Sequence, residues 1–356
     1  MIDLNAIAPL GAFALLLGAL LVWLSVPLIP AMMELIRPRD ATPLNAVGND
    51  AGRLTYFADS FTQFATQEGL LGMTVPARLS DGTRVRAHAH HSPITSSDQS
   101  VTDVVVLMDS EPLPDNTVLE RECVARRSTR GSAGVTYRAL LGQEDVLLGR
   151  DSAILRWVHA RGRLVAEAGT RLIGRATADE SITLATNVSF DRLESGVVQV
   201  SGNVPPERPA MATDTHHAFV PERAVSMGPN YWRVTGDLTI PAGAALTGSV
   251  IATGSIVVRE GARVTGSMKA HRAIRIESGA VIRGSCTARG RIDVGAGSRV
   301  SGPVISETDV YVRSAIVGAP GKLTTVTAPI IRLMPGATVY GAIMAAESGL
   351  TMASAQ

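Results

Sequence analysis

The side chains of this chain that could do chemistry are its histidines and its two cysteines. His88, His90 and His91 form an H-x-H-H cluster, and strand alternation would place His88 and His90 on one face, as in a metal site. No cysteine or acidic ligand lies at a recognisable spacing from them, so a metal site is the weaker interpretation. Cys286 falls in an apolar column of a repeat, and Cys123 is expected to point inward as well. We therefore predict no catalytic residue, no metal and no other cofactor.

The composition indicates a narrow core built from small and branched side chains. The chain has 356 residues, with 33 Lys and Arg against 32 Asp and Glu, which gives a net charge of +1. That balance argues against a nucleic-acid binder, which is usually strongly basic. Glycine accounts for 34 residues and aromatic residues for only 4%. The two cysteines exclude a disulfide-rich scaffold.

An uncharged run extends from Leu4 to Met33. Its densest part, residues 10–29, is long enough for a transmembrane helix of roughly 20 residues. No basic region precedes it and no clear cleavage site follows, so we predict an uncleaved anchor rather than a signal peptide. Arg37 and Arg39 follow the run, and the positive-inside tendency then places the rest of the chain in the cytoplasm. The residues expected in the membrane include Leu10, Phe13, Leu17, Leu21, Trp23 and Ile29.

The residues between the anchor and the repeats predict one helix and short strands. Residues 52–71 carry Phe57, Phe61 and Phe64 at i, i+4 and i+7, which is one face of an amphipathic helix. This helix could cap a nearby core or lie on the membrane just past the anchor. Its polar face is not rich in Lys or Arg, so the cap is favoured.

The strongest signal is a repeat of 18 residues. Glycines recur on two interlocked ladders with this period, and apolar columns keep the same period between them. Three short alternating strands per period, turned at glycine, predict an all-β solenoid, a parallel triangular β-helix for which a right-handed coil is favoured. The glycines are expected where the chain needs positive φ or close backbone approach, at Gly243, Gly248, Gly261, Gly266, Gly279, Gly284, Gly297, Gly302, Gly336 and Gly341. The core columns include Leu238, Ile240, Ile256, Val258, Ile274, Ile276, Ile292 and Val294.

The same period appears upstream, and the Pro-rich residues between the two repeat regions indicate a loop. The spacing lengthens by three residues near Gly318–Lys322, which predicts an insertion there. The expected divisions are an anchor (1–36), a linker with the amphipathic helix and short strands (37–116), a first β-helix segment (117–201), a loop excursion (202–233), a second β-helix segment (234–345) and a C-terminal tail (346–356).

The repeat units SIVVREGARVTGSMKAHR and AIRIESGAVIRGSCTARG resemble the rungs of bactofilins, the polymer-forming cytoskeletal proteins of bacteria. Those rungs are similar in having a short apolar strand, a G-x-x-[VIL]-x-G-x-[VIL] stretch and a small corner. The resemblance covers residues 234–345 well, residues 146–190 less well, and residues 52–114 not at all. It implies a nucleotide-independent scaffold at the cytoplasmic face of the bacterial inner membrane. Subunits would stack end to end and position enzymes of cell-wall or surface-polysaccharide synthesis.

Self-association also has a physical basis in the repeat itself. The end coil of a β-helix carries unpaired N–H and C=O groups, which invite another chain to pair. Repeated end-to-end contact of this kind gives a filament. We predict this contact at the C-terminal coil, through Tyr340, Ile343 and Met344. The expected partners are thus a second copy, the lipid bilayer and envelope or polysaccharide-synthesis proteins.

A membrane-tethered acyltransferase with hexapeptide repeats is the alternative, because apolar residues also recur every six, as at Ile240, Leu246 and Ala252. Such an enzyme needs a catalytic histidine, and the repeats contain His159 and His271. Each lies between inward-facing neighbours, so each is expected to point outward as a surface residue. A trimer with an acyl-donor cleft could still use His271, so an acyltransferase is the second interpretation of the sequence.

Overall fold

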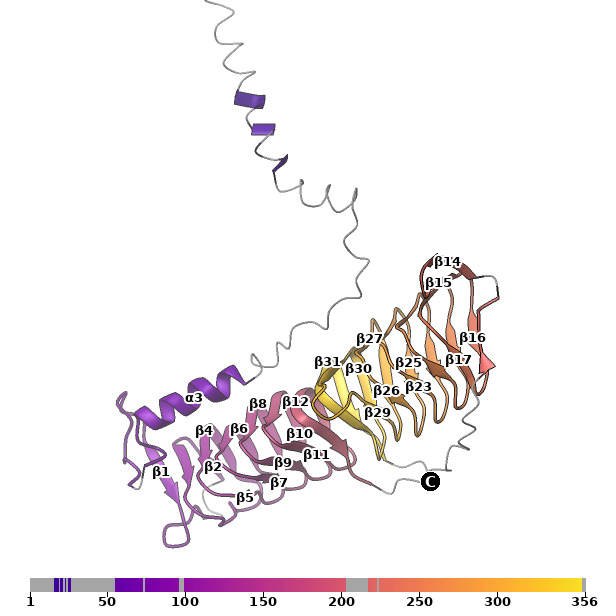
Figure 1. Cartoon of the computed structure of the whole chain (residues 1–356). Coiled ribbons are helices and arrows are strands. Elements are labelled where there is room, and N and C mark those ends of the chain that lie inside the picture. Colours follow the sequence, from indigo (N-terminus) through magenta and orange to yellow (C-terminus); the bar gives the residue numbers. More distant parts are fainter. Residues whose placement is uncertain are drawn as a thin grey trace, which may run out of the picture. The chain divides into compact units, whose positions relative to one another are not determined.

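The computed structural model of the protein describes residues 55–72, 74–95, 99–202, 217–222 and 224–353, with several positions between 16 and 26. The described residues from 55 onward belong to one compact unit. This unit is an all-β solenoid in which short parallel strands stack at a spacing of about 18 residues, with the helix α3 (Tyr56–Gln67) beside it (Figure 1).

The first segment has two strands in most coils, and the longer of the two bends at a bulge. Thus β8 pairs in parallel with β6 on one side and with β10 on the other, and the register shifts between Tyr137 and Ala139. The strands are β1 (Val85–His88), β2 (Ser100–Val101), β3 (Val104–Leu107), β4 (Val118–Ala125), β5 (Thr129–Arg130), β6 (Thr136–Gly142), β7 (Val146–Leu148), β8 (Ala153–Ala160), β9 (Arg163–Ala166), β10 (Arg171–Ala178), β11 (Ser181–Leu184) and β12 (Ser189–Val200).

Most coils of the second segment have three short strands, whereas β30 and β31 at its end are long, and the registers follow the sequence period. Ile256 pairs with Ile274, and Ile274 with Ile292, each one period further along the chain. The strands are β13 (His217–Ala218), β14 (Ala224–Gly228), β15 (Tyr231–Val234), β16 (Leu238–Ile240), β17 (Ala244–Leu246), β18 (Ser249–Ala252), β19 (Ile256–Val258), β20 (Arg263–Val264), β21 (Met268–Ala270), β22 (Ile274–Ile276), β23 (Val281–Ile282), β24 (Cys286–Ala288), β25 (Ile292–Val294), β26 (Arg299–Val300), β27 (Val304–Ser306), β28 (Asp309–Val312), β29 (Ile316–Val317), β30 (Thr324–Leu333) and β31 (Thr338–Thr351).

The two glycine ladders have two different physical causes. Gly243 and its successors on the same ladder have φ between +64° and +68°, a conformation that side chains rarely adopt. Gly266 does not have positive φ, but a Cβ there would overlap the backbone of Gly248 in the preceding coil. The same overlap recurs at Gly284 and Gly302. The first ladder therefore turns the chain, and the second lets successive corners stack closely.

One continuous apolar core fills both segments. All eight side chains of the predicted core columns are buried, at most 5% exposed. Most of this core is Val, Ile, Leu and Ala, and its largest fully buried side chains, Tyr137 and Phe190, lie in the first segment. The narrow interior explains why a chain with few aromatic residues can still fill its core.

Helix α3 covers the outer face of the first segment. Ala58 and Ala65 are buried on its inner side, and the Phe61 ring meets the Trp157 ring edge-on at 5.4 Å. A second apolar cluster beneath it includes the outward-facing Val106 and Val124. The expected helix is thus present and packs against a core, as favoured. Part of its aromatic face stays exposed.

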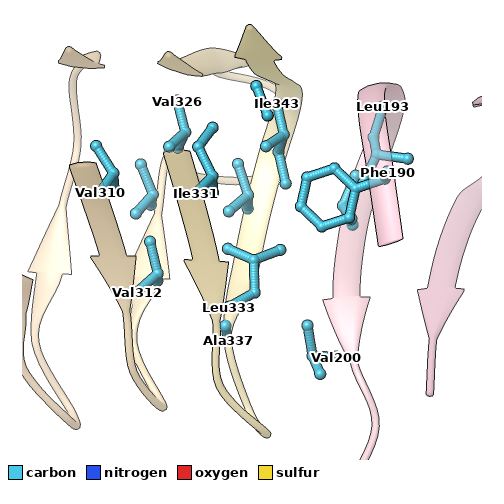
Figure 2. Packing of buried hydrophobic residues seen from close by; sticks show 14 of the residues in the cluster. Phe190, Leu193, Val200, Val310, Val312, Val326, Ile331, Leu333, Ala337 and Ile343 are labelled. Carbon is cyan, nitrogen blue, oxygen red and sulfur yellow. The ribbon is translucent and has the colours of Figure 1, made fainter. Parts of the chain in front are cut away.

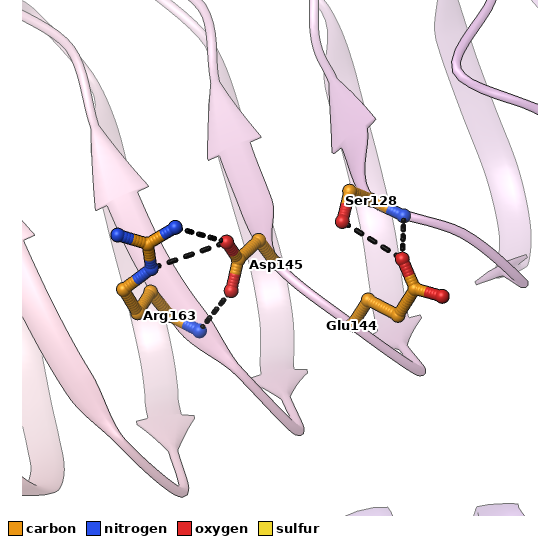
Figure 3. Close-up of polar contacts among 4 residues, drawn as sticks. All are labelled: Ser128, Glu144, Asp145 and Arg163. Atoms are coloured by element: carbon orange, nitrogen blue, oxygen red, sulfur yellow. Dashed lines mark hydrogen bonds and ion pairs between the residues drawn. The ribbon is translucent and has the colours of Figure 1, made fainter.

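Polar contacts tie neighbouring coils of the first segment together, and Figure 3 shows two of them. The Asp145 carboxylate accepts hydrogen bonds from the backbone N–H of Arg163 at 2.7 Å and from its Nη2 at 2.6 Å. These bonds lower the pKa of Asp145. Glu144 accepts from the backbone N–H and the hydroxyl of Ser128 in the same way. Such exposed contacts fix register more than they add stability.

The segments meet end to end, because the second one begins at its far end and winds back to the first. β31, the last strand of the second segment, pairs antiparallel with β12, the last strand of the first (Figure 1). Leu193 of β12 lies opposite Ile343 of β31. Figure 2 shows Phe190 and Leu193 facing Ile343 and Leu333 across this junction. The core is therefore continuous through it.

Three expected boundaries differ from the structure. The second segment begins at β13 rather than at residue 234, because β13 pairs with β17 and β15 with β18. The first segment begins at β1 rather than at residue 117, because β1 and β3 pair in the same stack as β4. The second segment extends to Thr351, so residues 346–351, expected in a tail, complete β31. The predicted insertion near Gly318–Lys322 is a turn, where Ala319 and Lys322 form an isolated bridge.

Part of the expected anchor lies outside the described residues, namely Leu10, Phe13 and Ile29. Leu17, Leu21 and Trp23 are helical and exposed. In the part of the chain that the structure describes, no helix has both the length and the apolar character needed to cross a bilayer.

Candidate functional site

The histidine cluster does not form a ligand set. His88 is buried, and its Nδ1 accepts a hydrogen bond from the backbone N–H of Ile94 at 2.9 Å, which holds the turn after β1. His90 and His91 are exposed, and their rings contact each other. Within the described ranges, no three His, Cys, Asp or Glu side chains come together as metal ligands.

The cysteines and His271 lie where the sequence places them. Cys123 and Cys286 are fully buried, and burial raises the pKa of the Cys286 thiol to about 12. The pKa of Cys123 is raised by the same cause. Both thiols are therefore protonated and shielded at neutral pH. His271 is exposed at the end of β21.

The prediction that His159 is a surface residue is wrong. The residue is only 5% exposed, because α3 packs across β6 and β8. Its Nδ1 lies 2.8 Å from Thr177 Oγ1, and its Nε2 lies 3.7 Å from Asp179 Oδ1. Asp179, His159 and Thr177 thus lie in the order acid, imidazole and hydroxyl that activates a nucleophile. Thr177 is itself buried, however, so its hydroxyl is not exposed to a substrate. Burial lowers the pKa of His159, so the imidazole is a neutral, packed group.

The three residues expected to bind a second copy lie in β31, at the junction within one chain. Ile343 is fully buried against Leu193, and Met344 pairs with Arg192. Tyr340 is partly buried next to them. The C-terminal coil is therefore covered by the first segment and is not a free end.

The junction also buries polar groups that find no partner among the described residues. Glu194 of β12 lies opposite Ala342 of β31 and is 8% exposed. No described residue forms a hydrogen bond with its Oε2, or with the hydroxyls of Ser195 and Thr324. Because burial disfavours the charged carboxylate, the pKa of Glu194 is raised to about 7.

The far end of the second segment is its exposed end. There β14 pairs antiparallel with β15, and β15 pairs in parallel with β18. The other edge of β14 meets no described strand. Residues around it expose large apolar side chains, namely Val220 (62%), Val225 (60%), Met227 (55%) and Tyr231 (37%). An unpaired edge strand beside an exposed apolar patch is the arrangement expected of a protein contact.

The outer end of the first segment is different in character. Residues 77–79 cover part of β1. The Val85 backbone N–H donates a hydrogen bond to the Ala77 carbonyl oxygen, and the backbones of Arg78 and Arg84 form an isolated antiparallel β-bridge. The turn next to β1 exposes His90, His91 and Ser92. The described residues of this end therefore present a polar surface, whereas the β14 end presents an apolar one.

The β14 end lies in residues interpreted as a loop excursion from the sequence. A signal for it exists, since Ala224–Gly228 and Tyr231–Val234 flank a Pro-Asn turn in which Asn230 has φ +57°. The prolines upstream favour a loop and therefore obscure this hairpin pattern in the sequence.

Comparison with known proteins places the chain in no group, since no protein-family model, no curated protein and no solved structure matches it.

Proposed function

We propose that this protein is a membrane-anchored, self-associating scaffold of bactofilin type, in which coils of triangular cross-section stack without a catalytic site. The proposal is supported by the β-solenoid fold and by the 18-residue rungs that resemble bactofilin rungs. The observation that carries it is the exposed end at β14, where one edge of the strand has no partner among the described residues and four large apolar side chains are exposed.

A second copy of the chain is the partner that fits this end. An edge strand can pair antiparallel with its own copy about a two-fold axis, so that each copy satisfies the other's backbone groups. The chain already uses antiparallel pairing of end strands to join its two segments at β12 and β31. A two-fold contact at β14 uses the same surface on both copies, so it gives dimers only. A longer assembly would need a second contact, at the polar outer end of the first segment.

The uncharged run at residues 10–29 supplies the membrane anchor in this proposal, with the solenoid on the cytoplasmic face of a bacterial inner membrane. A paired, anchored solenoid would offer two long strand faces near the bilayer. We infer that these faces position envelope or polysaccharide-synthesis proteins.

Cysteine cross-linking tests the contact directly. Met227→Cys places a thiol on the exposed end, and Ile305→Cys places one on the outer face of β27 as a matched control. The native Cys123 and Cys286 are buried, so a short bismaleimide reaches only the introduced thiol. We expect Met227→Cys to give a covalent pair in most molecules and Ile305→Cys to remain single. Equal cross-linking of the two variants, or none at position 227, would contradict the proposed end contact.

A further inference from the structure

A hollow of about 540 Å³ lies on the flank of the first segment, beside the start of α3. Phe57 of α3 forms one wall, and strands β8, β10, β12 and β31 supply the rest. The charged side chains that line it are Arg156, Arg175, Arg192, Asp191 and Glu347. Positive charge is therefore in excess within it.

A glycine in the lining of the hollow lets two coils stack closely. Gly174 follows Arg156 by one coil, and a Cβ at position 174 would overlap the Arg156 carbonyl oxygen. The Gly174 N–H donates to Asp191 Oδ2 at 2.9 Å, which holds that carboxylate against the backbone. The Arg175 guanidinium lies 4.4 Å from the centre of the Phe57 ring, so its charge is fixed at the rim.

An exposed aromatic face of α3 adjoins the hollow and shares Phe57 with it. Tyr56, Phe57 and Phe64 are 64%, 43% and 38% exposed, although Ala58 and Ala65 on the inner side are buried. Ser60 lies four positions from both Tyr56 and Phe64, so it occupies the middle of this face. Large aromatic side chains left in water beside arginines are typical of surfaces that lie at a membrane interface.

We propose that this flank binds the surface of an anionic lipid bilayer, with a lipid phosphate in the hollow and the α3 aromatic face at headgroup level. Arginine binds phosphate through two parallel N–H donors, and Arg156 and Arg192 are both exposed and line the hollow. A free phosphate would use the arginines alone, whereas a bilayer also accounts for the aromatic face. This contact is separate from self-association at β14 and adds to the predicted anchor.

The test uses the full chain carrying Ser60→Cys, labelled with an environment-sensitive fluorophore and reconstituted into vesicles. The buried native cysteines leave position 60 as the labelled site. In vesicles that contain phosphatidylglycerol, we expect a blue shift of emission and quenching by bromine-labelled lipid. In phosphatidylcholine alone, or at high salt, the docked fraction should fall.

Variant pairs decide the role of the hollow. Arg156→Gln with Arg192→Gln should weaken docking about thirtyfold, since each basic side chain near an anionic surface contributes on the order of fivefold. Arg263→Gln with Arg283→Gln removes the same charge from exposed positions of the second segment and should leave docking unchanged. The proposal is overturned if the label shifts equally in both lipids, if it shifts in neither, or if both variant pairs weaken docking alike. A change in emission on adding millimolar inorganic phosphate, with no quenching by bromine-labelled lipid, would instead show a soluble-anion site and overturn the proposal.

Discussion

Gly349→Val should destabilise the protein by about 3 kcal/mol or more, because it forces a side chain into the junction between the segments. Gly349 of β31 lies opposite Phe190 of β12. A Cβ at position 349 would overlap the Phe190 ring and would lie 2.5 Å from the backbone carbonyl oxygen of Phe190. Phe190 is 2% exposed, so its ring has no solvent space into which to move.

Amide hydrogen exchange locates this effect. Stability in a stacked-coil protein is carried by contacts between neighbouring coils, so protection should fall in β12 and β31 and persist near β22. Gly196→Val in β12 is the control, because a Cβ there would meet the Glu180 carbonyl oxygen no closer than 3.2 Å. Unchanged protection at β12 and β31 in Gly349→Val would show that the segments do not pack through this junction.

Glu194→Gln should stabilise the protein above neutral pH and have little effect in acid. The folded-state pKa of Glu194 is raised from 4.5 to about 7, so the folded protein holds a proton that the unfolded chain has released. Stability contributed by this protonation is present below pH 4.5 and is lost as the pH rises towards 7. The loss is on the order of 3 kcal/mol, which corresponds to about 5 °C in Tm.

Melting curves between pH 4.5 and 8 check the sign of this effect. As the pH rises across this range, titration of Glu194 should lower the wild-type Tm, and the Tm of Glu194→Gln should not show this decrease. Glu307→Gln, on an exposed turn of the second segment, should follow the wild type. If Glu194→Gln instead lowers Tm at pH 8, the carboxylate has a charged partner that the junction geometry does not show.

The sequence period was sufficient to predict the coils and their core. Apolar side chains one period apart, such as Ile256 and Ile274, pair directly, because each coil must bury its inner face against the next. Gly243 and Gly248 were also predicted to relieve a turn or a close approach: Gly243 has positive φ alone, whereas Gly248 has positive φ and also approaches the Asn230 backbone closely. These features are local to a repeat and therefore readable from spacing.

The features that join elements distant in sequence were not readable in this way. A period fixes which residues stack within a segment, but it does not tell where an interrupted solenoid reattaches. The pairing of β12 with β31 brings together Leu193 and Ile343, which are far apart in the chain, and covers the coil expected to bind another copy. His159 was misplaced for a similar reason, since the helix that buries it lies far upstream in the sequence.

The most direct test of the proposed self-association is the mass of the full chain in a neutral detergent, measured by sedimentation equilibrium over a wide concentration range. We expect at least two copies per particle, and about a hundredfold weaker association for Val225→Lys with Met227→Lys, because two unpaired charges would enter the contact. Ile305→Lys with Leu323→Lys, which adds the same charge at other exposed apolar positions, should associate as the wild type does. A wild-type chain that stays single at every concentration would contradict the proposed self-association.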